Sequence, residues 1–340
     1  MRSSRAPRLR VVAAFTVVAL VALLTAVLAP VTASAHDASE APAELKLRAG
    51  MNDPKDPNIA VLEFLPEKVS VVAGEKVTWS IDGPEPHSVT FVAPGSPVPS
   101  AETDPSLFVG SGTPTDYDGS TLVNSGVLPL PTQTDGATFS MSFSKPGDYT
   151  YYCVLHPEMV GTVTVGDEDV NTQAEVNAAA RKERTKYLAE GRAAKKKLAA
   201  TKPKSTKNSD GSSTWTVQMG ASTAHTDVLA FAPTPSEVKA GDSVTFVNNS
   251  KAPHTASFGG ALVPQNPLAP EVQQPQPGPS PETLTAGVYL NTGWLPPNTG
   301  ATGAPLAARS YTYSVADPGR FEYVCVLHLP SGMAAELDAG

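Results

Sequence analysis

The chain has 340 residues, a length that favours two domains over one. Hydrophobic residues make up 41% of the chain and charged residues only 17%, while its 33 prolines and 26 glycines favour strands and turns over helices. The net charge is -8 at neutral pH, with acid in excess in both halves, which disfavours nucleic acid as a partner. We therefore expect an all-β protein.

The first 35 residues have the form of a secretory signal peptide. Four arginines precede an apolar run from Val11 to Ala29, and the A-x-A sequence at residues 33–35 forms a cleavage site before His36. We expect the mature protein to be exported to the periplasm, the cell surface or the extracellular medium. Because the apolar run is long enough to span a bilayer, an uncleaved anchor is the alternative, and it is the only membrane contact that we expect.

Beyond this segment the sequence contains two copies of one unit, residues 44–166 and 214–340. The copies share three early motifs at constant spacing and one later motif after a short insertion. The matching pairs are VLEFLP (61–66) with VLAFAP (228–233), AGEKVTW (73–79) with AGDSVTF (240–246), Pro86-His87 with Pro253-His254, and KPGDYTYYCVLH (145–156) with DPGRFEYVCVLH (317–328). Such a tandem duplication predicts two domains of the same fold.

Each copy has the pattern of short strands joined by turns. Residues 68–80 form two β-rich runs separated by Ala-Gly, and residues 138–153 alternate apolar and polar side chains around a Pro-Gly turn. The stretches 93–136 and 260–307 are rich in Pro, Gly, Ser and Thr, so we expect loops with little regular structure there. Seven or eight short strands per copy predict a β-sandwich.

The segment between the copies, residues 167–213, has a different composition. A capping-box sequence from Thr172 to Glu175 opens a stretch rich in Ala, Lys, Arg and Glu that runs to Ala200. Acid at its start and base at its end suit the helix dipole, so we expect a helix, weakened at Gly191. We interpret it as a solvated spacer followed by a flexible linker at residues 201–213; packing against a domain or an acidic partner is the alternative.

Cysteine, histidine and methionine occur together in both copies. Each copy ends a strand-like run in Cys-x-x-His, and a methionine follows closely, Met159 in one copy and Met333 in the other. Because an exported protein meets an oxidising compartment, a disulfide between Cys153 and Cys325 is one interpretation. The other is a metal site, since a thiolate, an imidazole and a thioether on one loop, with a second imidazole from the distant Pro-His, form the donor set of a blue-copper site.

With these motifs, both copies resemble cupredoxins of the plastocyanin, amicyanin and pseudoazurin type. The resemblance covers residues 44–166 and 214–340, and it implies two Greek-key β-sandwiches that each bind one type 1 copper ion. It assigns the copper ligands to His87, Cys153, His156 and Met159 in the first copy and to His254, Cys325, His328 and Met333 in the second. Domains that keep the ligands but bind no copper are the remaining alternative.

Two departures from the family pattern affect these expectations. The family usually has an asparagine five residues before the first histidine ligand, which secures the ligand loops; the second copy has Asn249 there and the first has Asp82. We expect a carboxylate at that position to stabilise Cu(II) and to lower the potential of the first site. The sequence after Met333 also differs from the matching part of the first copy, so we expect a short or frayed last strand there.

Histidine supply argues against an enzyme. Two-domain copper oxidases and nitrite reductases of this fold need additional imidazoles for a trinuclear or type 2 copper site. The chain has six histidines, four of which are assigned above, so only His36 and His225 remain. A trinuclear site is therefore excluded and a type 2 site is not expected. We interpret His36 as part of a solvated tail, with copper chelation by a mature N-terminus as the alternative, and His225 as a surface residue.

Two functions of different classes remain. The first is electron transfer with a redox partner protein, in which the outer histidine of each ligand loop, His156 or His328, emerges through an apolar patch. The resemblance implies Pro157 and Val160, or Leu329 and Pro330, for these patches. The second is copper buffering or delivery, because thiolate and thioether ligands also suit Cu(I). The sequence favours electron transfer, since a copper chaperone more often carries exposed Met-rich or His-rich tracts.

Overall fold

The computed structural model describes residues 44–101, 104–112, 114, 116–129, 137–168, 170–235, 237–276, 282–298 and 305–340. The expected signal peptide and His36 lie outside these residues. Among the residues described, no helix combines the length and the apolarity needed to cross a membrane.

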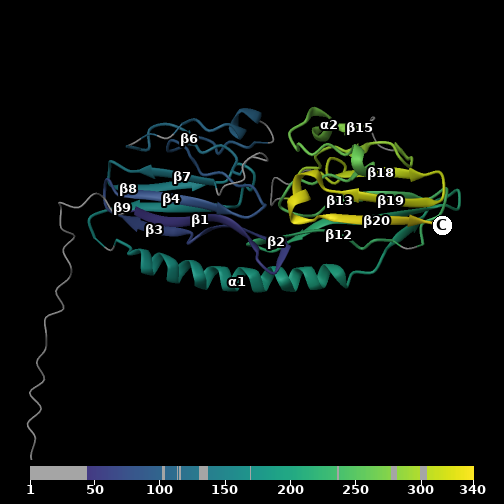
Figure 1. The fold of residues 1–340 in the computed structure, drawn as a ribbon, viewed down its shortest axis with the longest axis horizontal. Helices are drawn as coiled ribbons and strands as arrows, with labels where there is room; N and C mark the ends of the chain where they lie inside the picture. The colour runs from purple at the N-terminus through teal and green to yellow at the C-terminus, as the bar shows by residue number, and fades with distance from the viewer. Residues whose placement is uncertain are drawn as a thin grey trace, which may run out of the picture. The chain divides into compact units, whose positions relative to one another are not determined.

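Each copy folds as a β-sandwich, as predicted (Figure 1). The elements of the first copy are β1 (Glu44–Asp53), β2 (Asp56–Leu65), β3 (Lys68–Val71), β4 (Lys76–Asp82), β5 (Thr90–Phe91), the 3-10 turn η1 (Pro105–Phe108), β6 (Val123–Asn124), β7 (Ala137–Ser142), β8 (Gly147–Tyr152) and β9 (Val160–Val165). One layer contains β2, β1, β4 and β7, and the other contains β3, β9, β8, β5 and β6.

The second copy repeats this arrangement. Its elements are β11 (Ser213–Ser222), β12 (Thr226–Ala232), β13 (Ser243–Asn248), β14 (Ser257–Phe258), η2 (Gly260–Leu262), α2 (Pro270–Gln273), β15 (Pro275–Gln276), β16 (Glu282–Leu284), β17 (Leu290–Thr292), β18 (Ser310–Val315), β19 (Gly319–Val324), η4 (Val326–Ser331) and β20 (Ala334–Ala339). The stretches expected to be irregular loops therefore contain short elements, such as β6 and the corresponding β17.

Equivalent aromatic side chains fill the two cores. Alternation along β8 turns Tyr149 and Tyr151 inward, as period-two patterning requires. Trp79 packs edge-on against Tyr151 with ring centroids 5.1 Å apart, and the corresponding pair in the second copy, Phe246 and Tyr323, has the same separation. These rings support the strand ends from which the cysteines emerge.

The two sandwiches share one sheet of ten strands. Its main path is β16-β18-β13-β11-β12-β2-β1-β4-β7, so β12 of the second copy pairs directly with β2 of the first. This pairing is antiparallel, with Thr226 opposite Val61 and Val228 opposite Ile59. The described residues from Glu44 to Gly340 accordingly form one compact unit.

Helix α1 (Gln173–Ala199) begins with the predicted capping box, in which Thr172 and Glu175 bond reciprocally. Its interpretation as a solvated spacer is wrong, because the helix packs against strands of both copies, β2 and β12 among them (Figure 1). The side chains of Tyr187 and Leu188 join a buried cluster with Ile59 and neighbouring residues. Because the helix is polar overall, the sequence did not predict this narrow apolar contact.

Two further expectations are corrected, one about the linker and one about the second copy. The segment after the helix is not wholly flexible, since β10 (Ser205–Lys207) pairs with β11. The last strand is not short, because β20 pairs with β19 along its whole length, from Gly319 opposite Ala339 to Val324 opposite Ala334. Met333 therefore directly precedes a regular strand.

Candidate metal centres

The first candidate centre consists of His87, Cys153 and His156. Cys153 follows the end of β8, and the tight loop to β9 carries His156. The backbone N–H of Cys153 donates to Met159 O at 3.1 Å, and the N–H of Met159 donates to His156 O at 2.8 Å. These bonds bring Cys153, His156 and Met159 together at one end of the sandwich, and Met159 is buried beside Cys153 in the core cluster.

The second candidate centre consists of His254, Cys325 and His328, and its loop is closed in the same way. The N–H of Cys325 donates to Met333 O at 3.0 Å, and the N–H of Met333 donates to His328 O at 3.3 Å. Here the turn η4 carries the histidine, and Gly332 leaves it with a φ of 76°, in the left-handed region that favours glycine. Met333 is again buried in the core cluster.

A distant segment supplies the remaining imidazole of each centre. His87 exchanges backbone hydrogen bonds with Leu128, and His254 does so with Leu295. These isolated bridges place both histidines opposite the cysteine loops. Sequence spacing alone did not predict that His87 pairs with Leu128 or His254 with Leu295. It did identify the two histidines as members of the two centres.

Donor atoms converge in both centres. Cys153 Sγ lies 3.4 Å from Nδ1 of His156 and 4.0 Å from Nδ1 of His87. Cys325 Sγ lies 3.3 Å from Nδ1 of His328 and 3.6 Å from Nδ1 of His254. In each group one donor atom from every residue lies within 4.8 Å of the others.

Electrostatics favour a thiolate in each centre. Burial by itself raises the pKa of the Cys153 thiol, but the neighbouring His156 and His87 rings lower that pKa well below its usual range. The same opposition holds at Cys325, where His328 and His254 lower the pKa. A thiolate is the form of cysteine that binds metals.

Both cysteines are unpaired, so a disulfide between them is excluded in this structure. Each sulfur instead accepts an N–H bond at 3.3 Å, from Ser88 in the first copy and from Thr255 in the second. The hydroxyl groups of the same two residues accept from the backbone N–H that follows each cysteine, both at 2.9 Å. Serine and threonine thus fix the cysteine loops identically.

The histidines supplied by the distant segments, His87 and His254, are called the inner histidines, and they differ in the contacts of Nε2. His254 Nε2 lies 2.7 Å from Ser250 Oγ, whereas His87 Nε2 is buried without a hydrogen-bond partner among the described residues. Gly50 covers His87 so closely that a Cβ at position 50 would overlap Nε2, and its φ of 67° also favours glycine. Close packing thus replaces a hydrogen bond in the first centre.

The asparagine that secures the second loop is Asn248 and not Asn249. Asn248 is fully buried, and its Nδ2 donates to O of Ala252 at 2.9 Å and to O of Leu295 at 3.0 Å. Asn249 instead accepts from Arg309 at 2.6 Å. The sequence motif was therefore read one residue out of register.

Asp82, at the position corresponding to Asn249, lies 2.6 Å from Arg48 in an ion pair, and its side chain is 43% exposed. Our expectation that its carboxylate supports the first copper site and lowers its potential loses its structural basis. In the first copy, Asn52 holds the histidine loop instead, because its Oδ1 accepts the N–H of Glu85 at 3.1 Å.

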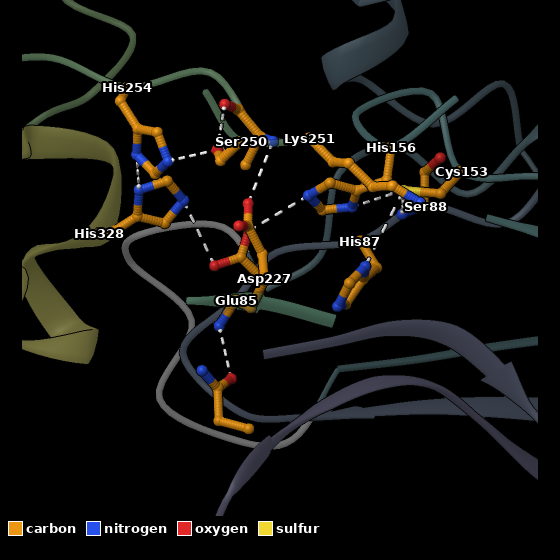
Figure 2. A network of polar contacts seen from close by, with 12 residues as sticks. Glu85, His87, Ser88, Cys153, His156, Asp227, Ser250, Lys251, His254 and His328 are labelled. Carbon is orange, nitrogen blue, oxygen red and sulfur yellow. Dashed lines mark hydrogen bonds and ion pairs between the residues drawn. The ribbon is translucent and has the colours of Figure 1, made fainter. Parts of the chain in front are cut away.

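The outer histidines are almost fully buried and do not emerge through an exposed patch as we expected, but two of the expected patch residues, Leu329 and Pro330, line a cavity with His328. The side chains of His156 and His328 are 4% and 3% exposed, and both rings face one carboxylate, Glu85 (Figure 2). Glu85 Oε1 lies 3.2 Å from Nε2 of His156, and Oε2 lies 3.4 Å from Nε2 of His328. Sequence reasoning missed Glu85, because the corresponding position in the second copy is Ala252 and no repeat marks it.

Charge on this buried group depends on both histidines. Burial by itself raises the pKa of Glu85, but His328 and His156 lower it well below its usual range. In return, Cys153 and Glu85 raise the pKa of His156 to about 10 against the opposing effect of burial. The three side chains therefore form one electrostatic unit between the copies.

A cavity of about 520 Å³ adjoins this unit. Its lining includes Glu85, His156 and His328, with apolar side chains from both copies around them. Phe108 of the first copy and Trp294 of the second face each other here, with ring centroids 6.2 Å apart. Both outer histidines therefore border an apolar cavity to which both copies contribute.

The donor sets fit copper. One thiolate and two imidazole nitrogens in a buried group select a transition metal of intermediate softness, and a nearby thioether is typical of blue-copper sites. His225 takes no part, since it stacks on Tyr187 at 4.1 Å and pairs with Glu190 at 2.8 Å. Its side chain is 25% exposed, so it is partly at the surface, as we expected, and it also packs against α1.

Comparison with known proteins gives a consistent result. A model of the plastocyanin/azurin family of copper binding proteins matches residues 55–166. The plastocyanin of Solanum tuberosum is 35% identical over 106 residues, which are 31% of this chain and 88% of that protein. Amicyanin-alpha of Methylorubrum extorquens is 30% identical over 107 residues, 32% of this chain and 67% of that protein.

The chain spans a smaller part of other relatives, 57% of the chloroplastic plastocyanin of Hordeum vulgare and 51% of that of Solanum lycopersicum. Among solved structures, a mutant plastocyanin of fern is 27% identical, and the match covers 36% of this chain and 99% of that chain with a TM-score of 0.24. So low a TM-score adds nothing to the sequence matches, on which the relationship rests.

Proposed function

Because the chain belongs to the plastocyanin/azurin family of copper-binding proteins, we propose that it is an exported electron carrier with one type 1 copper site in each copy. The observation that carries this proposal is the pair of buried groups in which one thiolate and two Nδ1 atoms converge. Export is inferred from the N-terminal sequence alone.

The proposed ligands are the residues that the family motif assigns. His87, Cys153 and His156 would hold copper in the first centre with Met159 as a weak axial ligand, and the second centre would use His254, Cys325, His328 and Met333 in the same roles. Copper bound there supplies a one-electron couple between Cu(II) and Cu(I).

The protein's own contribution is a rigid and dry set of donors. Taken as whole residues, the two cysteines and the inner histidines are 0% exposed, and the outer histidines are 3% exposed. Backbone bonds within each ligand loop and N–H bonds to each sulfur fix the donor positions before any metal arrives. Such preorganisation keeps the ligand geometry nearly constant during a change of charge, as electron transfer requires.

The histidine inventory supports a carrier over an enzyme. Four of the six histidines belong to the two centres, and His225 packs against α1. The described residues contain no third group of metal-binding side chains. The histidines left for a second type of copper site are therefore His36 and His225, of which His225 packs against α1.

The test compares electron exchange with copper release. Stopped-flow mixing of the Cu(I) protein with ferricyanide measures oxidation, and incubation with bicinchoninic acid measures loss of Cu(I). We expect ferricyanide to oxidise the Cu(I) protein completely in a period over which the chelator removes almost no copper, because the donor atoms are buried. Slow oxidation together with ready transfer of Cu(I) to the chelator would instead favour copper buffering or delivery.

A further inference from the structure

The two metal centres share one side chain. We propose that Glu85 is a positioning residue common to both centres, and that His156, Glu85 and His328 form a polar bridge between them. This inference rests on the proposed function for its metal, but the bridge itself consists of residues of this chain.

The first argument is the placement of the carboxylate. Glu85 belongs to the first copy and is 2% exposed, yet its two oxygens face histidines from different copies, at 3.2 Å for His156 and 3.4 Å for His328. In both histidines Nδ1 faces the cysteine sulfur, so Nε2 is the atom left to face Glu85. Figure 2 shows Glu85 between the two rings.

The second argument is chemical. A histidine that binds a metal through Nδ1 keeps its proton on Nε2, and a carboxylate that accepts this proton fixes the tautomer and the ring orientation. Oε2 of Glu85 is buried, and among the described residues it has no regular hydrogen-bond partner apart from its ion-pair contact with His328. An N–H held on Nε2 of His328 is the donor that would satisfy this oxygen.

The third argument is that each copy forms a polar contact with the ligand loop of the other copy. Lys251 of the second copy forms an ion pair with Glu158, which lies between His156 and Met159. Asn58 of the first copy donates from Nδ2 to O of Ser331 at 2.7 Å, within the loop of the second centre. Neither ligand loop is therefore built by its own copy alone.

The duplication makes this arrangement informative. The residue that corresponds to Glu85 in the second copy is Ala252, which is buried and carries no charge. Two independent carriers of the same fold would not need a buried carboxylate at this position in one copy and an alanine in the other. A single acid shared by both centres accounts for this asymmetry.

The decisive variants place the change in one copy and the measurement in the other. Cys153→Ala leaves only the second centre able to bind copper, so adding Glu85→Ala tests whether a residue of the first copy acts on that centre. We expect Cu(II) affinity of the second centre to fall roughly tenfold to a hundredfold, as for other groups that orient metal-bound histidines.

Reduction potential gives a readout that general destabilisation does not produce. A carboxylate on Nε2–H makes the imidazole a stronger donor and favours Cu(II), so the potential should rise when Glu85 is removed. A tenfold loss of Cu(II) affinity at unchanged Cu(I) affinity corresponds to a rise of about 59 mV for one electron. Asp82→Asn is the matched control, since it removes a nearby acid that touches neither histidine.

Glu85→Gln refines the test, because an amide of the same shape has one acceptor oxygen and one donor nitrogen. Only one histidine can then keep its partner, so we expect one centre to retain its potential while the other shifts as in Glu85→Ala. If both centres keep their wild-type reduction potentials in Glu85→Ala and in Glu85→Gln, the proposal is overturned.

A metal-free measurement separates this inference from the proposed function. In the apoprotein, nitrogen-15 NMR should show two slowly exchanging Nε2 protons, from His156 and His328, that disappear in Glu85→Ala and persist in Asp82→Asn. Persistence of both protons in Glu85→Ala would overturn the shared role of Glu85. Failure of the wild-type chain to bind copper would overturn the proposed function and leave this result standing.

Discussion

Gly191 of α1 lies so close to Ile59 of β2 that a Cβ at position 191 would overlap the Cγ2 methyl group of Ile59. The same Cβ would lie 3.2 Å from Oγ1 of Thr226 on β12. Gly191 therefore marks the point at which the helix touches both copies where β2 and β12 pair. The sequence suggested a weak point in a helix, whereas the structure shows a close approach.

The first prediction concerns this contact. Helix propensity alone would make Gly191→Ala stabilising by about 1 kcal/mol. Because Ile59 is buried and cannot move away freely, we expect the variant to lose about 1–3 kcal/mol of unfolding free energy through overpacking. Urea unfolding measures the change, and Ala193→Gly at an exposed helix position is the control for propensity. A more stable Gly191→Ala would show that α1 does not pack here.

The second prediction concerns Gly50 and the first centre. Alanine at this position would have a side chain where Nε2 of His87 lies, so we expect Gly50→Ala to lose copper binding in the first centre only. Gly74 has a similar φ of 85° but open space around it, which makes Gly74→Ala a control for backbone strain. Copper content per chain and visible absorption should both fall to roughly half in Gly50→Ala and stay whole in Gly74→Ala. Equal losses in the two variants would refute the steric argument.

The third prediction distinguishes Asn248 from Asn249. Asn248→Ala leaves the carbonyl groups of Ala252 and Leu295 without their donor, at a cost of about 1–3 kcal/mol for an unsatisfied buried group. We expect weaker copper binding in the second centre and none of this effect in the first. Asn249→Ala, which removes only a contact with Arg309, should be nearly neutral. A larger effect at Asn249 would restore the register assumed from sequence.

The fourth prediction concerns pH and Glu63 on β2. Burial, together with Glu67, Glu183 and Glu158 against the opposing charge of Lys251, raises the pKa of Glu63 to about 8. The folded protein then keeps a proton that the unfolded chain has lost between about pH 4.5 and 8, so folding stability falls as pH rises through that range.

Glu63→Gln removes this dependence, and the difference isolates it from other titrating groups. We expect the variant to match the wild type near pH 5 and to become more stable toward pH 8, with a slope of at most about 1.4 kcal/mol per pH unit. Urea unfolding at a series of pH values measures this, and Glu322→Gln at an exposed site is the control. A constant difference across the range would mean that Glu63 is ionised in the folded protein.

Local sequence was sufficient for the sandwiches and for the members of the two centres. Strand alternation around Tyr149 and Tyr151, and the Cys-x-x-His loops, depend on residues close together in the chain. Repetition at constant spacing then identified the distant histidines, His87 and His254, as their partners. These features were predictable because each follows from short-range patterning or from the duplication.

Contacts between the copies were not predictable in the same way. The pairing of β2 with β12 has no local signal, since any exposed edge strand offers the same backbone groups. The packing of α1 depends on a few apolar residues and on ion pairs such as that of Arg192 with Asp53 at 2.7 Å. The composition of the helix as a whole does not reveal such individual contacts. The burial of the outer histidines, and the position of Glu85 between them, follow from the packing of the two copies against each other.

The most direct measurement is the visible spectrum of the copper-loaded protein beside Cys153→Ala and Cys325→Ala. Two type 1 sites predict two copper ions per chain and an intense thiolate-to-copper band, of which each variant loses roughly half. A colourless wild-type protein after copper loading, or loss of the whole band in one variant alone, would contradict the presence of a blue-copper site in each copy.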